Sequence, residues 1–156
     1  MIKADDIVAS DWVRPKRQYR RGGYRRRLTC PPYSPKPEEF GRILEGYKWA
    51  MLLEFGPRRP NHNCRGPHKA GVELEREAFP KGYYSASGLG CGPCLYCDEC
   101  NLEKCVRPDL ARPSMEACGT EVYTAVSRAG FDLEVVKRHE APRPRTSACC
   151  LSNERP

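Results

Sequence analysis

The chain has 156 residues, a formal net charge of +7 and 39% hydrophobic residues. This composition excludes a coiled coil, a collagen, a membrane protein and an acidic disordered tail. Ten cysteines are the unusual feature, and six of them lie between Cys91 and Cys118. Because 13 glycines and 15 prolines add many turns, we expect one small, loop-rich domain that uses its thiols.

The N-terminal stretch argues against secretion. Its sequence, MIKADDIVASD, has acidic residues where a signal peptide carries positive charge, and no long apolar segment follows. The longest apolar run, residues 49–53, is too short to cross a bilayer. We therefore expect a cytoplasmic protein that does not contact membranes and whose thiols stay reduced. Closely spaced cysteines then indicate metal ligands or redox groups, with a secreted disulfide scaffold as the alternative.

Positive charge is concentrated in a basic N-terminal arm, residues 1–29, and shortly beyond it. Between Trp12 and Pro37 there are nine basic residues and no acidic one, whereas the rest of the chain has 18 basic and 20 acidic residues. Arginines interleaved with aromatic residues can neutralise phosphates and stack on bases, so residues 12–29 are a candidate nucleic-acid segment. The same arm can dock on a protein partner with an acidic surface, or wrap around its own domain.

Periodicity predicts the elements that follow the arm. Prolines after Cys30 predict an extended stretch, and Pro37 then begins a helix with one apolar face. A short buried strand over 48–55 and a polar loop over 56–71 come next. Residues 72–87 have helical periodicity, which Pro80 is expected to kink or split.

Further elements are predicted beyond the cysteine segment. One helical turn over 114–118 is ended by Gly119, and Thr120 caps a helix that reaches residue 129. This helix is expected to turn Val122, Tyr123 and Val126 inward. A second strand is predicted over 131–136, followed by a loose, proline-rich tail.

These elements define the predicted organisation. Helices and strands are mixed without regular alternation, so the fold class is α+β, in a small single domain. Residues 1–29 form the basic arm, residues 30–136 the cysteine-rich metal-binding domain, and residues 137–156 the polar tail.

The cysteine segment has the spacing of a metal site. Its core is CGPCLYCDECNLEKC, and its two-residue gaps let consecutive thiolates converge on one metal or cluster. Iron–sulfur proteins often use C-x2-C-x2-C plus a fourth cysteine, although here the last gap is four residues rather than three. We therefore predict a 4Fe–4S cluster, with Cys91 and Cys118 as neighbours or substitute ligands. The four principal ligands are Cys94, Cys97, Cys100 and Cys105.

Zinc is the alternative metal, because structural zinc is commonly held by two CxxC pairs, though these are usually further apart. The first hypothesis for function is a small electron-transfer protein or redox accessory whose arm docks on an acidic partner. The second is a structural zinc protein whose arm binds nucleic acid. The third is an enzyme that uses a cluster with an open coordination site, and it comes last because the sequence has no nucleophile–base pair, phosphate loop or cofactor motif.

The run from Cys30 to Val122 resembles a family of predicted metal-binding proteins, domain of unknown function 2284. The resemblance implies that Cys94, Cys97, Cys100 and Cys105 are the central ligands. At Cys91 and Cys118 the family pattern also admits small or apolar residues. The matching stretches are TCPPYSPKPEEFGRILEGYKWAMLL, LEREAFPKGYYSA, GPCLYCDECNLEKCVRP and ARPSMEACGTEV.

The chain departs from this family before Cys30. Members usually carry two further cysteines shortly before the CPP motif, whereas Arg17 and Gly22 stand at the matching places here. Cys30 therefore lacks the partners that an N-terminal metal site would need.

Several other residues are weaker candidates for chemistry. His62, Cys64 and His68 have spacing that can bind a metal, and with Cys30 they are candidates for a second site or parts of a polar loop. Glu116 is a candidate proton carrier or hydrogen-bond acceptor near the cluster, or an ordinary helix carboxylate. The vicinal pair Cys149 and Cys150 and the flanking Arg107 and Arg112 complete this set.

Overall fold

The computed structural model describes residues 1–20, 23–55, 65–131 and 146–152. Its helices and antiparallel sheet confirm the predicted α+β class. The strands are β1 (Ile2–Lys3), β2 (Trp49–Phe55), β3 (Ser87–Leu89) and β4 (Thr146–Ser152). The α-helices are α1 (Val13–Arg20), α2 (Pro37–Glu45), α3 (Arg65–Ala78) and α4 (Val122–Arg128). Short 3-10 turns are η1 (Ala4–Asp6), η2 (Phe79–Lys81) and η3 (Met115–Cys118).

The sheet has the strand order β1-β2-β4-β3, with every neighbouring pair antiparallel. Its longest pairing joins β2 to β4, with Leu52 opposite Cys149, and β3 then pairs with the other edge of β4. Alternate residues of β2 point to opposite faces, so Ala50 and Leu52 are buried on one face of the sheet.

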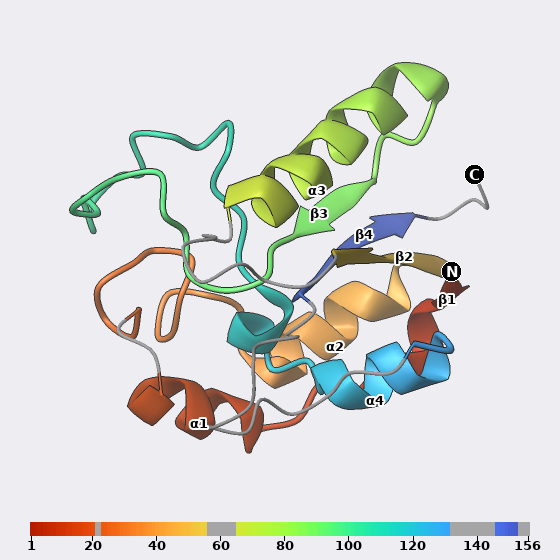
Figure 1. Ribbon diagram of the computed structural model, residues 1–156, viewed down its shortest axis with the longest axis horizontal. Coiled ribbons are helices and arrows are strands. Elements are labelled where there is room, and N and C mark those ends of the chain that lie inside the picture. Colours follow the sequence, from red (N-terminus) through yellow and green to blue (C-terminus); the bar gives the residue numbers. More distant parts are fainter. Residues whose placement is uncertain (21–22, 56–64, 132–145, 153–156) are drawn as a thin grey trace.

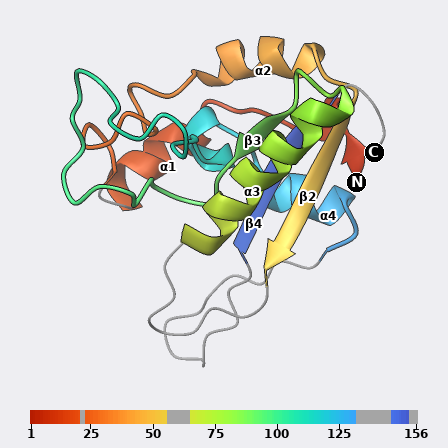
Figure 2. The same cartoon turned by 90° about the horizontal axis from the view of Figure 1, so that it is seen from above.

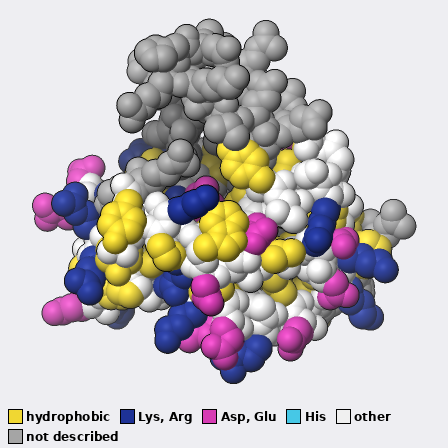
Figure 3. Space-filling model, turned by 90° about the horizontal axis from the view of Figure 1, so that it is seen from below, with side chains coloured by type: hydrophobic (Ala, Val, Ile, Leu, Met, Phe, Trp, Pro, Cys, Tyr) yellow, Lys and Arg dark blue, Asp and Glu magenta, His cyan; other side chains and the backbone are white. Residues whose placement is uncertain are grey.

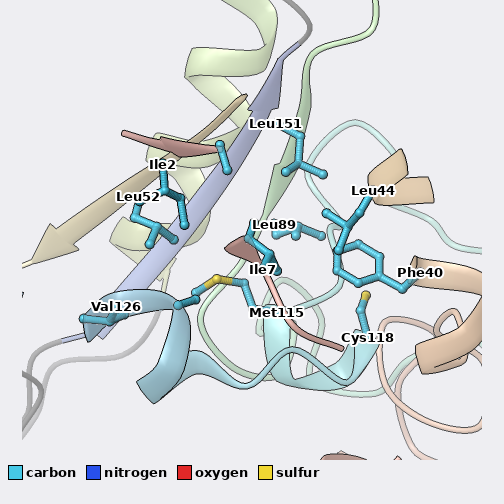
Figure 4. Close-up of a cluster of buried hydrophobic side chains, with 12 residues drawn as sticks. Ile2, Ile7, Phe40, Leu44, Leu52, Leu89, Met115, Cys118, Val126 and Leu151 are labelled. Atoms are coloured by element: carbon cyan, nitrogen blue, oxygen red, sulfur yellow. The ribbon is translucent and has the colours of Figure 1, made fainter. Parts of the chain in front are cut away.

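Helices cover both faces of this sheet. Helix α3 packs on one face, and α2 and α4 lie on the other, as two perpendicular views show (Figures 1 and 2). The hydrophobic core fills the space between the sheet, α2, α4 and η3 (Figure 4). Its members come from every layer on that side: Ile2, Ile7, Phe40, Leu44, Ala50, Leu52, Leu89, Met115, Cys118, Ala125, Val126 and Leu151.

Local signals explain why α2 and η3 meet where they do. Helix α2 begins with Pro37, and the Glu39 carboxylate accepts the Lys36 backbone N–H at 2.8 Å. The turn η3, which the sequence predicts over 114–118, is capped by Ser114 and ends, as predicted, at Gly119, with φ of 90°. A Cβ on Gly119 would lie 2.6 Å from Cγ of Pro37, so glycine is needed for both the turn and the packing.

The N-terminal residues pack on the rest of the chain. Ile2 and Ile7 belong to the core, Ser10 donates its N–H to the Gly119 carbonyl at 2.9 Å, and Glu121 donates its N–H to Val8 at 2.9 Å. In the part of the chain that is described, no helix is long and apolar enough to cross a bilayer.

Several predicted boundaries differ from the structure. Helix α3 begins at Arg65, inside the predicted loop, because Pro67 in its first turn is compatible with a helix. It ends at Ala78, before Pro80, as proline geometry requires. Helix α4 has Glu121 rather than Thr120 at its N-cap, and Tyr123, expected to point inward, is 54% exposed.

The loose tail predicted after residue 137 is wrong for β4. Thr146–Ser152 lies between β2 and β3, where both edges of its backbone find partners, and Leu151 is 1% exposed in the core. The strand predicted over 131–136 lies outside the described residues except for Phe131, which is not in a strand and packs against the core.

Replacing Leu151 with alanine should therefore destabilise the domain strongly. The loss of a fully buried leucine costs about 2–5 kcal/mol, because a cavity remains in the core. Urea unfolding followed by circular dichroism measures the change. Leu102→Ala is the control, since Leu102 is 38% exposed, and a Leu151→Ala effect no larger than the control would contradict the central placement of β4.

Candidate metal centre

Residues 91–113, the cysteine segment, contain neither helix nor strand and form a loop beside residues 23–36 (Figures 1 and 2). The two ends of the loop are fastened together. Gly90 donates its N–H to the Pro113 carbonyl at 2.8 Å, and Met115 donates its N–H to the Gly90 carbonyl at 3.2 Å. The loop therefore leaves β3 and joins η3 at one point, which fixes its position on the domain.

Arginines from outside the loop bind its backbone carbonyls. Arg27 donates to the carbonyls of Cys97 at 2.5 Å and Asp98 at 3.1 Å. Arg65, at the start of α3, donates twice to the Leu95 carbonyl, at 2.8 and 3.0 Å. A loop without a hydrogen-bond ladder needs such donors, and a guanidinium group offers five.

An ion pair holds the far end of the loop against α3. Arg112 donates to both carboxylate oxygens of Glu75, at 2.5 and 2.9 Å, and the two side chains are 23% and 22% exposed. Glu75 also accepts the Gly88 N–H at 2.8 Å, which ties β3 to the same pair. Burial raises the pKa of Glu75, but hydrogen bonds from Arg112 and Gly88 and the charge of Arg112 outweigh it, so the pKa is lowered.

Two other thiols of the cysteine segment, Cys97 and Cys105, act on the pKa of Cys94. Cys94 is buried, and its pKa is raised first by burial and then by the nearby charges of Cys97 and Cys105. The Tyr96 backbone N–H donates to the Cys94 sulfur and, with the charge of Arg27, opposes this rise. Cys100 is half-buried, and its sulfur lies 3.9 Å from the Asn101 carbonyl oxygen.

The spacing of these thiols bears on the size of the group they can hold. Four thiolates on one zinc ion must approach one another to about 3.8 Å. Among the described residues, no three His, Cys, Asp or Glu side chains come together in a group that could hold one ion. A cubane has four corners that face different directions, so its four ligands stay further apart than those of a single zinc ion.

Tyr96 supplies an independent indication of a missing partner. Its hydroxyl oxygen is buried and has no hydrogen-bond partner among the residues that the structure describes. A buried, unpaired polar group costs about 1–3 kcal/mol, so such groups are rare and call for an explanation. Burial raises the pKa of Tyr96, and the charge of Cys94 raises it further. An electron-rich sulfur centre held by the loop would accept this hydrogen bond.

Comparison with known proteins identifies a family for the chain. The chain belongs to the family described as "Predicted metal-binding protein (DUF2284)", which matches residues 1–151. The resemblance expected from the sequence is thereby confirmed, and the family match supports metal binding by this cysteine-rich chain. No curated protein and no solved structure matches the chain.

Two further cysteines of this DUF2284 chain are fully buried. Cys118 lies in the hydrophobic core, where burial raises its pKa to about 12 despite the opposing charge of Arg14, so it packs as a neutral thiol. Cys30 lies against the cysteine segment: a Cβ on Gly23 would lie 2.7 Å from the Cys30 sulfur and 3.3 Å from Cβ of Pro93. Glycine at position 23 therefore allows Cys30 to pack there.

Of the second candidate site, only His68 and Cys30 can be placed, because His62 and Cys64 lie outside the described residues. His68 is 3% exposed in α3, and its imidazole ring packs on Gly90, where a Cβ would overlap the ring. The ring also meets Tyr96 edge to face, with 6.4 Å between ring centroids. His68 therefore contacts the loop at two places, Gly90 and Tyr96.

The remaining candidates are placed by backbone position or ion pairs. Glu116 pairs with the guanidinium group of Arg17 at 2.8 Å, and Arg17, itself 5% exposed, also donates to the Ser114 hydroxyl at 3.2 Å. Arg107 contacts Asp109, at 3.4 Å. Cys149 and Cys150, expected in the tail, have their backbones in β4.

Sequence reasoning missed the residues that hold the loop, which are Arg27, Arg65 and Glu75. Their partners lie 13 to 71 positions away along the chain, so no local pattern marks them. In the sequence, the acidic and basic residues of α3 are typical of a solvent-exposed helix face and do not indicate contacts with the loop.

Replacing Glu75 with glutamine should destabilise the domain by about 1.5–3 kcal/mol at pH 7, because a charged hydrogen-bonded pair is lost. The folded pKa of Glu75 is lowered from 4.5, so its contribution is present above pH 4.5 and is lost as the pH falls through the folded pKa. The difference between Glu75→Gln and wild type in urea unfolding should therefore shrink in acid. Glu77→Gln, on an exposed position of the same helix, is the control, and a pH-independent difference would contradict the assignment.

Replacing Arg27 with glutamine should loosen the loop around Cys97. Without the two hydrogen bonds to the Cys97 and Asp98 carbonyls, maleimide should label Cys97 and Cys100 several-fold faster in the folded, metal-free protein. Peptide mass spectrometry measures the rates. Arg26→Gln removes a neighbouring exposed cation and should leave the rates unchanged; equal rates in all three proteins would show that Arg27 does not hold the loop.

Proposed function

We propose that this chain is a small iron–sulfur protein that transfers electrons or serves as a redox accessory to a larger enzyme. Its 4Fe–4S cluster is held by Cys94, Cys97, Cys100 and Cys105. The observation that carries the proposal is the close spacing of four cysteines on a loop whose two ends are fastened together. When bound, such a cluster accepts and releases one electron at a time.

The surroundings of the thiols suit a redox centre. The Tyr96 N–H and the Arg27 charge both favour the anionic form of Cys94. The same contacts stabilise the more negative, reduced state of a cluster and so raise its reduction potential. Cys94 is buried, whereas Cys100 and Cys105 are half-buried, so one side of the site is shielded and the other lies closer to a partner.

The basic arm supports a protein partner with an acidic surface. Arg17 and Arg27 are engaged within the chain, whereas Lys16, Arg25 and Arg26 are exposed. Because Arg27 places this segment beside Cys97, a partner bound to Arg25 and Arg26 lies next to the cluster ligands. On the face that carries α1 and α4, basic side chains alternate with acidic ones rather than forming one positive surface (Figure 3). Long nucleic acids need such a continuous surface, so this pattern favours the protein partner.

Purification without oxygen tests the proposal directly. Iron, inorganic sulfide and zinc are counted, and absorption and electron paramagnetic resonance spectra are recorded. Four iron and four sulfide per chain with a broad visible band support it. A colourless protein with one zinc overturns it and favours the structural zinc protein, for which salt-sensitive nucleic-acid binding through residues 12–29 is then the next measurement.

Replacing Cys97 with serine should abolish the cluster, because one of four thiolates is lost. The loss is measured as iron per folded chain, with circular dichroism as the check on folding. Cys118→Ala is the matched control: it removes a core thiol, should lower stability, and should leave the iron content unchanged. A folded Cys97→Ser protein with full iron content, or a folded Cys118→Ala protein without iron, would contradict the ligand set.

A further inference from the structure

Tyr96 lies between two proposed ligands, yet its ring contacts a residue outside the loop. The ring meets the His68 imidazole edge to face, at 85° between ring planes. His68 is buried in α3 and packs on Gly90, next to the point where the loop ends are fastened together. His68 therefore gives the Tyr96 ring a contact in α3, outside the cysteine segment.

The hydroxyl group of Tyr96 is buried. It has no hydrogen-bond partner among the described residues, although a buried tyrosine hydroxyl usually finds one. Its charged neighbours are Cys94, Arg65, Arg107 and Asp109, whose charges act on its pKa after the effect of burial. The guanidinium group of Arg65 binds the Leu95 carbonyl, and that of Arg107 binds Asp109.

We propose that the Tyr96 hydroxyl donates a hydrogen bond to the sulfur shell of the metal centre, which makes Tyr96 a positioning residue for that centre. The proposal rests on the ligand set of the proposed function, but not on whether the metal is iron or zinc. Tyr96 then contributes two donors to the same shell, its backbone N–H to Cys94 and its side chain O–H. Donors of this kind orient metal ligands and spread their negative charge.

Tyr96→Phe removes this hydroxyl and keeps the ring. If the hydroxyl lacks a partner without metal, the metal-free variant should unfold at the same urea concentration as wild type or a higher one. With metal, the lost donor should weaken binding by about tenfold, the lower end of the effect of ligand-orienting contacts. A role confined to the protein's own packing predicts the reverse: lower stability without metal and unchanged metal affinity.

The affinity is measured by titrating the reduced, metal-free chain with cobalt(II), which reports thiolate binding through a sulfur-to-cobalt absorption band. Tyr84→Phe is the control, because Tyr84 is 72% exposed and also packs edge to face, on Phe79. Weaker cobalt binding in Tyr96→Phe alone, without loss of metal-free stability, is the expected result. Equal affinities in all three proteins, a destabilised metal-free Tyr96→Phe protein, or a wild type that binds no cobalt would overturn the inference.

These outcomes separate the inference from the proposed function. A wild type that holds zinc or cobalt but assembles no iron–sulfur cluster defeats the iron–sulfur proposal and leaves the role of Tyr96 standing. A wild type with a full cluster whose iron content, reduction potential and cobalt affinity are all matched by Tyr96→Phe defeats the role of Tyr96 alone.

Discussion

The cysteine segment depends on hydrogen bonds that it cannot make with itself. Its backbone has no helix or sheet ladder, so its carbonyl groups need donors from elsewhere in the domain. Arg27 and Arg65 supply them from two sides, and the Glu75–Arg112 pair fixes the far end to α3. The same contacts bring the N-terminal segment, α3 and β3 together at the loop. The site is thus supported by elements that contribute no ligand.

The parts of the fold that the sequence predicted are those with local signals. Helix α2 follows from Pro37 and its apolar face, and η3 from Ser114 and Gly119. Strand β4 was missed because its polar, cysteine-containing residues resemble a tail, and only its place between β2 and β3 makes it a strand. The sequence predicts a loop over 56–71 because glycine and proline are frequent there, yet α3 already begins at Arg65. A first helical turn accepts a proline such as Pro67.

The residues of the candidate site also divide into those that local sequence patterns predict and those that only the fold reveals. The ligand candidates follow from the regular spacing of cysteines, which is local. The position of Cys118 in the hydrophobic core cannot be predicted from spacing, because a core cysteine and a metal-bound cysteine look alike in sequence. Arg27 and the His68–Tyr96 contact join residues that are far apart along the chain, so only the fold reveals them.

The place of β4 has a consequence for biosynthesis. Among the described strands, β3 pairs with β4 alone, and β4 follows the cysteine segment along the chain. All the cysteines of the metal segment have then been synthesised before the strand that completes the sheet is available. Contacts between residues far apart along the chain stabilise the fold only after the long loop between them has closed. The growing chain therefore carries the thiols of the cysteine segment before the sheet is complete. A metal that binds these thiols during synthesis therefore meets them before β3 has its partner strand.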